Sequence, residues 1–175
     1  MSVFGLTIQY GIGDGTGEAS LQRFQLAMER FGDGISDFGK FVFPNVLEVL
    51  EKQVDEQFDA RGHGPVAGPW APLSPKYAKW KEVHFPGMPI LERTGVLRAA
   101  LTQDSGPNAM RDYSAAQLNF GTIGVPYASF HQTGAPWLPV RAPFDFGPEL
   151  DDRLQMAMQK GVIQAAREAE LEVTP

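Results

Sequence analysis

Hydrophobic residues recur at three- and four-residue steps in three long stretches of the chain, a spacing typical of amphipathic helices. The first covers residues 18–31, and Gly32-Asp33-Gly34 predicts its end. The second runs from about Ile35 to Ala60, with an expected kink or break just before Pro44, because proline lacks an amide donor and clashes with the preceding turn. The third covers Glu149 to Leu171 and closes the chain.

Alternation of apolar and polar residues predicts extended structure elsewhere. Val3 to Tyr10 is expected to form a short strand or an extended arm. Ser114 to Ile123 reads as a strand with one buried face. Its partners are expected at 101–105 or 110–113, and at 138–140.

Shorter helices are predicted in the middle of the chain. Ser74 followed by Pro75 has the chemistry of a helix start, with Ser as the N-cap and Pro in the first turn. Thr94 is expected to cap a second short helix, from Gly95 to about Leu101. On it we expect a buried face, with Arg98 pointing away; the face consists of Val96, Leu97, Ala100 and Leu101.

Glycine and proline delimit the segments around these helices. Residues 62–75 break every hydrophobic period and form a predicted loop, from which Trp70 should dock on the core because a large aromatic side chain is costly to leave in water. Residues 127–133 should form one or two helical turns that stop at Gly134. The glycines of 11–17 lack the spacing of a phosphate-binding loop, so we expect a turn there.

These elements predict an α+β fold, with amphipathic helices packed on a small antiparallel sheet and with extended arms and loops. A chain of 175 residues that is 43% hydrophobic suits a single domain over 1–175. Within it we expect a strand or flexible arm at 1–17, a helical region at 18–61, a core at 62–147 and a C-terminal helix at 148–175.

Charge and composition exclude several classes of function. The net charge of −6 argues against broad binding to nucleic acid or to an anionic membrane. The absence of cysteine excludes disulfides and thiolate metal sites and fits synthesis in a reducing cytoplasm. No signal-peptide pattern and no run of roughly 20 apolar residues is present, so we expect a soluble, unprocessed chain without a membrane span.

No convincing catalytic arrangement emerges from the histidines, His63, His84 and His131. None lies in an HExxH motif. His131 and Ser129 are two residues apart, so on a helix they would face different directions. We therefore expect a packing or hydrogen-bonding histidine at 131, no metal, no cofactor and no enzymatic activity.

Arginines and aromatic residues beside glycines and prolines are better candidates for contacts between subunits. An arginine in such a place can pair across an interface or hold a loop carbonyl, although Arg93 and Arg98 could equally be surface residues without a role. The aromatics lack interleaved basic residues and are expected to be core or interface anchors, not base-stacking platforms. The predicted contact residues are Trp70, Arg93, Arg98, Tyr127, His131, Gln132, Trp137, Arg141 and Phe144.

Five short blocks of residues 58–147 occur in an order that resembles a known family. They are Trp70-Ala71-Pro72-Leu73-Ser74-Pro75, Lys79 to Lys81, Ile90-Leu91-x-x-Thr94-Gly95-x-Leu97-Arg98, Gly124 with Tyr127-Ala128-x-x-His131-Gln132-x-Gly134, and Pro139-x-Arg141-x-Pro143-Phe144. The chain thereby resembles the phage virion morphogenesis, or tail-completion, family of Mu-like and P2-like tailed phages. It departs from the family pattern at Ala142 and over the first 57 residues.

The resemblance implies a structural virion protein that acts in head-tail joining or tail completion, at the neck or the head-proximal end of the tail. It implies a homo-oligomeric ring, hexameric or dodecameric, around a channel through which DNA passes without sequence-specific binding. Neighbouring neck, portal-side or tail-tube proteins would be its partners. On this reading, substitution of Arg141 or Phe144 should impair ring formation more than folding.

Two other classes of function stay open. A small hydrolase would require Ser129, His131 and an acid to converge. A monomeric binding adaptor would form no ring.

Overall fold

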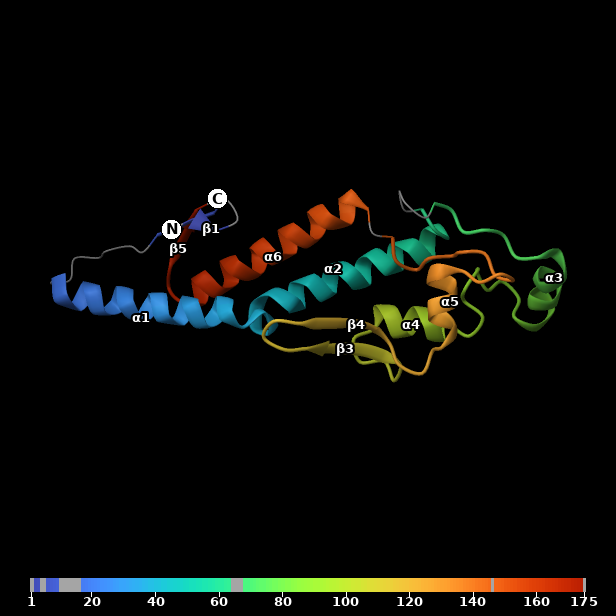
Figure 1. The fold of residues 1–175 in the computed structure, drawn as a ribbon, viewed down its shortest axis with the longest axis horizontal. Helices are drawn as coiled ribbons and strands as arrows, with labels where there is room; N and C mark the ends of the chain where they lie inside the picture. Colours follow the sequence, from blue (N-terminus) through green and yellow to red (C-terminus); the bar gives the residue numbers. More distant parts are fainter. Residues whose placement is uncertain (1, 4–5, 10–16, 64–67, 146, 175) are drawn as a thin grey trace. The chain divides into compact units, whose positions relative to one another are not determined.

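The computed structural model describes residues 2–3, 6–9, 17–63, 68–145 and 147–174, with side chains described over 25–63, 68–145 and 147–171. Within these residues the fold is α+β, as predicted: helices accompany small antiparallel sheets. In chain order the elements are β1 (Ser2–Val3), β2 (Leu6–Gln9), α1 (Gly17–Ser36), α2 (Phe38–Ala60), α3 (Pro75–His84), α4 (Val96–Thr102), β3 (Ala109–Tyr113), β4 (Leu118–Thr122), α5 (Tyr127–Thr133), α6 (Pro148–Glu168) and β5 (Glu172–Thr174) (Figure 1).

The chain forms two compact units, each of which is assembled from separate stretches of sequence. Unit 1 comprises Met1–Leu47, Tyr113–Leu118 and Leu154–Pro175. Unit 2 comprises Glu48–Asp112 and Asn119–Arg153. The single domain over 1–175 and its inner boundaries stay predictions.

The predicted end of the first helix at Gly32-Asp33-Gly34 is wrong, because α1 continues to Ser36. A Cβ atom at Gly34 would lie 3.1 Å from the Cβ of Ala165 and 3.3 Å from the ring of Phe41. The glycine therefore permits a close approach of packed elements in unit 1. This packing outweighs the cost of about 1 kcal/mol that glycine imposes inside a helix.

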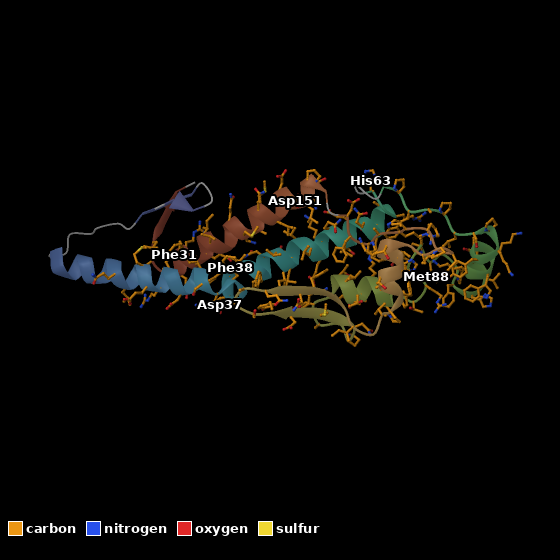
Figure 2. The ribbon with its side chains drawn as sticks, in the orientation of Figure 1. Phe31, Asp37, Phe38, His63, Met88 and Asp151 are labelled. Carbon is orange, nitrogen blue, oxygen red and sulfur yellow. The ribbon has the colours of Figure 1, made fainter. Side chains whose placement is uncertain are left out.

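The predicted break just before Pro44 is wrong, whereas the alternative of a kink there stays a prediction. Helix α2 runs continuously through Pro44, and the break between the first two helices falls at Asp37 (Figure 2). The side chain of Asp37 accepts a hydrogen bond from the amide of Gly39 at 2.9 Å, which is the geometry of an N-cap. Pro44 and Lys40 are both exposed, so the carbonyl that loses its amide partner can be hydrated.

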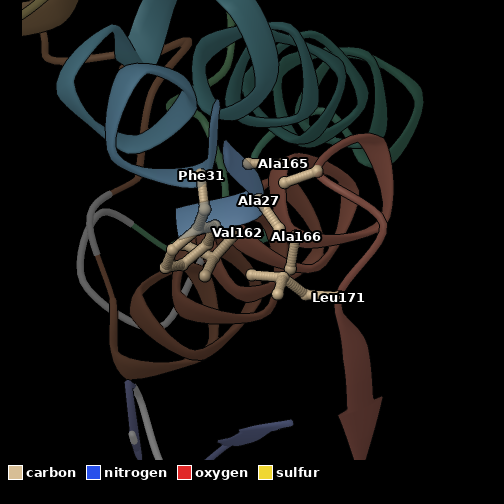
Figure 3. Close-up of a cluster of buried hydrophobic side chains, with 7 residues drawn as sticks. Ala27, Phe31, Val162, Ala165, Ala166 and Leu171 are labelled. Carbon is tan, nitrogen blue, oxygen red and sulfur yellow. The ribbon is translucent and has the colours of Figure 1, made fainter. Parts of the chain in front are cut away.

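A cluster of apolar side chains holds unit 1 together (Figure 3). Phe31 of α1 is almost fully buried and packs in this cluster with Val162 and Ala166 of α6. Where α6 passes α2, a Cβ atom at Gly161 would lie only 2.7 Å from the carbonyl oxygen of Phe41 and the Cα of Val42. The small residues of α6 thus permit close helix packing.

The prediction of a C-terminal helix over 148–175 is wrong at its end. Helix α6 stops at Glu168, and Glu170 has a positive φ of 61°. Strand β5 then pairs antiparallel with β2, with Ile8 opposite Val173. Extended structure is confirmed for the described part of Val3 to Tyr10, but it forms two antiparallel strands, β1 and β2, instead of a single strand or arm. Of the turn expected over 11–17, only Gly17 is described, and it begins α1.

Unit 2 has its own core, in which the predicted docking of Trp70 is confirmed. Trp70 is 6% exposed, and its ring meets that of Phe58 edge to face with 5.3 Å between centroids. The cluster also contains Leu97 and Leu101 of α4. Gly62, with φ 80°, approaches so closely that a Cβ atom there would lie 2.4 Å from the indole ring.

Of the strand predicted over 114–123, only β4 (Leu118–Thr122) is observed, and its residues are all half-buried, so the expected buried face is absent from it. Its expected partner at Met110–Tyr113 is confirmed, because β3 and β4 form a two-stranded antiparallel sheet. The other expected partner, residues 138–140, is no strand. Among the described residues, the strand-like pairing of this segment is an isolated bridge of Leu138 with Ala135. Prolines at 136 and 139 explain this, because they cannot donate to a strand ladder.

The short helices are confirmed in number and place, but not all of their details are. Ser74 caps α3 by accepting from the amide of Tyr77 at 3.4 Å, and Gly134 ends α5 as predicted. Thr94 does not cap α4: the N-cap is Gly95, whose φ of 75° favours glycine, and it makes no side-chain cap bond. Val96 is 38% exposed, so it does not belong to the buried face.

In the part of the chain that the structure describes, no helix combines the length and apolar character needed to cross a membrane.

Gly161→Ala should destabilise the protein by about 1–3 kcal/mol, because the new methyl group would overlap backbone atoms that cannot yield. The matched control is Gly32→Ala, at a helical position where a Cβ atom would meet nothing within 4 Å. There the better helix former should stabilise by about 0.5–1 kcal/mol. Urea unfolding of both variants checks this prediction, and equal effects would contradict it.

Candidate functional site

A pocket of about 440 Å³ lies in unit 2, lined by side chains from four stretches of the chain. These stretches are the loop before α3 with α3 itself, the segment leading into α4, helix α5, and residues 137–141. Apolar walls come from leucines, with Tyr127 and Trp137 beside them. Lys81, Arg93 and Arg141 supply positive charge, and none of the lining residues is a carboxylate.

Arg141 is held in place by backbone carbonyls. Its side chain donates from Nε to the carbonyl of Ala71 at 2.7 Å and from Nη2 to that of Pro72 at 2.9 Å. Burial lowers the pKa of the guanidinium, while Tyr77 acts in the opposite direction. An arginine stays charged at neutral pH even so. Arg141 is therefore a fixed, buried cation whose guanidinium is held by neutral carbonyl groups.

Lys81 is the second buried cation of the pocket. The residue is 4% exposed, and its ammonium group donates to the carbonyl of Pro89. Burial lowers its pKa, and the nearby carboxylate of Glu92 partly offsets this. That carboxylate also lies 3.3 Å from Arg98. Lys81 was missed by the sequence analysis because its burial depends on the loop after α3.

His131 lies on α5, beside Tyr127, with 6.2 Å between the ring centroids. Its Nδ1 atom is buried and has no hydrogen-bond partner among the described residues. Burial, and then the charge of Arg141, lower the pKa of the imidazole, which favours the neutral form at pH 7. The hydroxyl of Ser129 donates to the carbonyl of Pro126 at 3.2 Å, and no hydrogen bond between Ser129 and His131 is recorded in the described chain.

Trp70, Gln132 and Phe144, which were also predicted as contact residues, make contacts inside unit 2 as Arg141 does. Trp70 donates from its indole nitrogen to the carbonyl of Ala142 at 3.0 Å. Gln132 exchanges two hydrogen bonds with the backbone of Phe144, at 3.0 and 3.1 Å. The ring of Phe144 packs edge to face on Phe120. These residues fix the segment that follows the pocket.

Arg98 and Arg93 differ sharply in their surroundings. Arg98 lies 2.6 Å from both Asp55 and Asp59, in addition to its contact with Glu92. Burial disfavours its charge, but these carboxylates outweigh that effect and raise its pKa. Arg93 is exposed, lines the pocket, and lies over the ring of Phe85 at 5.7 Å.

An apolar rim lies beside the pocket, on α5 and the segment after it. We define the apolar rim as Tyr127, Phe130, Trp137 and Val140. Trp137 is 76% exposed, and its ring lies 6.3 Å from that of Phe130. Phe130 and Val140 are each about half exposed. Phe130 was not among the sequence-predicted contact residues, although its spacing from Tyr127 could have indicated it.

On α3, contrary to the prediction, basic residues are interleaved with aromatic ones. There Lys76, Lys79 and Lys81 alternate with Tyr77 and Trp80, which stack on each other at 5.5 Å. Only part of this charge reaches the surface, because Lys81 is buried. The helix is nonetheless a basic, aromatic element of an acidic chain.

The described residues contain no group of three or more His, Cys, Asp or Glu side chains that could hold a metal ion.

Comparison of the chain with protein-family models, with curated proteins and with solved structures finds no match.

We expect the pKa of His131, followed by NMR, to lie below its ordinary value of 6.5. The unfolded chain then binds more protons than the folded one, so stability should fall as the pH is lowered through the unfolded-state pKa. The charged and titratable groups that share the pocket are Tyr77, Lys81, Arg93, Tyr127 and Arg141. His131→Gln should reduce the loss of stability between about pH 7.5 and 5.5. A His131 pKa at or above 6.5 would contradict this account.

Proposed function

We propose that the chain is a structural virion protein of a tailed bacteriophage that acts in head-tail joining or tail completion. It would form a homo-oligomeric ring around the DNA channel, at the neck or the head-proximal end of the tail. Support comes from the order of the five sequence blocks between residues 58 and 147 and from one structural observation: the exposed apolar rim of unit 2.

The apolar rim has the composition of a protein interface. Tryptophan and tyrosine are enriched where proteins meet, because they bury a large area at a low cost in conformational entropy. Trp137 leaves 76% of its surface in water, with Phe130 and Val140 exposed nearby. Burial of these side chains against another copy would stabilise the assembly, because it removes apolar surface from water.

A ring places a specific demand on this surface. In a closed ring each subunit uses two different patches, one toward each neighbour, so the apolar rim would face another surface of the next copy and not itself. The copy number, hexamer or dodecamer, is set by the angle between these two patches.

The chain's acidity suits a channel through which DNA moves. With a net charge of −6, the assembled protein would lack the counterion-release term that makes basic proteins hold DNA. DNA would pass without sequence-specific binding, and the contacts of the ring would be with neck, portal-side or tail-tube proteins.

The structure changes which substitutions should test the ring. Arg141 and Phe144 were expected to act on assembly more than on folding. Both make contacts within unit 2, so their loss should also weaken the fold of the single chain. Trp137 and Phe130 are exposed and are better suited to the test.

Wild-type protein should elute as a multimer in size-exclusion chromatography with light scattering and show rings in negative-stain images. Trp137→Ser and Phe130→Ser should each shift the mass toward the monomer while leaving the unfolding midpoint nearly unchanged, since both side chains are exposed. The control is Met156→Ser, which removes a 68% exposed apolar side chain from α6.

A monomeric wild-type protein at micromolar concentration would favour the binding-adaptor alternative. A ring that survives both rim substitutions would place the subunit contact elsewhere on the chain.

A further inference from the structure

The charge of the pocket is opposite to the charge of the chain. The protein has 21 acidic and 15 basic residues, yet the pocket lining contains Lys81, Arg93 and Arg141 and no carboxylate. Packing alone does not explain why three cationic side chains gather around one cavity of an acidic protein. This set of lining residues favours an anion as the ligand.

The two buried cations lack a neutralising partner on the pocket side. Arg141 and Lys81 are held by carbonyl oxygens, which are neutral acceptors. The donors of Arg141 that these carbonyls engage are Nε and Nη2. Glu92 acts on Lys81 but is shared with Arg98 and does not line the pocket. Burial disfavours the charge of both groups, and a bound anion would offset that cost.

The remaining side chains of the pocket are largely apolar and favour a ligand with an apolar part. Leu73, Leu91 and Leu138 form aliphatic walls, and Tyr127 and Trp137 add aromatic surface. A cavity of about 440 Å³ accommodates a few side chains, whereas a nucleic-acid strand would need an extended basic groove along its backbone. The combination of aliphatic walls and fixed cations therefore fits a carboxylate-bearing peptide better than a nucleic acid.

We propose that this pocket is a docking site for an acidic segment of a partner protein, in which a Glu or Asp lies next to an aliphatic or aromatic residue. The carboxylate would meet Arg93 at the exposed surface and the fixed guanidinium of Arg141, because arginine matches the planar geometry of a carboxylate. The apolar neighbour would pack on the leucines. All of the lining residues belong to unit 2, so the pocket exists in the single chain. Two of them, Tyr127 and Trp137, also belong to the apolar rim, so a neighbouring copy and the peptide would share this surface.

Fluorescence anisotropy with a fluorescein-labelled pentapeptide, Asp-Leu-Glu-Phe-Asp, tests the proposal on the full chain. We expect saturable binding, a loss of affinity of about tenfold in Arg93→Gln, and partial retention in Arg93→Lys. The matched control is Lys52→Gln, which removes one exposed charge from α2 and should leave affinity unchanged. Photo-crosslinking of a benzophenone-bearing peptide should label residues that line the pocket.

The uncharged peptide Asn-Leu-Gln-Phe-Asn and a hexathymidylate strand are the competing probes. If the uncharged peptide binds as tightly as the acidic one, the cations do not recognise carboxylates and the proposal is overturned. Tighter binding of the oligonucleotide, with crosslinks to the pocket, would make the site one for nucleic acid and overturn the proposal. Absence of peptide binding, equal losses in Arg93→Gln and Lys52→Gln, or crosslinks outside the pocket would overturn it as well. Light scattering of the same samples reports assembly separately, so a failed ring and a failed pocket are distinguished.

Discussion

A reciprocal set of hydrogen bonds between residues 70–72 and 141–142 is the constraint on which the pocket depends. Trp70 donates to the carbonyl of Ala142, and Arg141 donates in return to the carbonyls of Ala71 and Pro72. The indole is fixed from its other side by Phe58 of α2. Because each segment satisfies polar groups of the other, the loop before α3 and the segment after α5 are held in register, and a guanidinium can stay buried between them.

Local patterns predicted those parts of the fold in which a residue acts on its immediate neighbours. The Ser74-Pro75 start of α3 and the Gly134 stop of α5 are of this kind. Errors arose where packing overrides local preference. Gly34 allows close packing instead of ending α1, and Pro44 is tolerated on an exposed side of α2. Thr94 has the chemistry of a cap, but the left-handed conformation of Gly95 starts the helix.

Some residues of the candidate site were named from the sequence, as expected contacts with a neighbouring subunit, but the pocket that they line was not predicted. Arg93, Tyr127, His131, Trp137 and Arg141 were all named from the sequence, and all of them line the pocket. Their shared surroundings could not be foreseen, because the stretches that meet there are separated by tens of residues and no local period connects them. The burial of Lys81 depends on the carbonyl of Pro89 and was missed for the same reason.

The bond between Trp70 and Ala142 joins residues 72 positions apart, and this has a consequence for biosynthesis. On the ribosome, the indole and its loop emerge long before the carbonyl that completes their hydrogen bonding. Contacts that close so long a loop form late and slow the folding of the chain. Until residue 142 is made, the indole nitrogen of Trp70 lacks the acceptor that it has in the folded unit, although its ring partner Phe58 is already present. The pocket of unit 2 can therefore be completed only after the segment around Arg141 has been made.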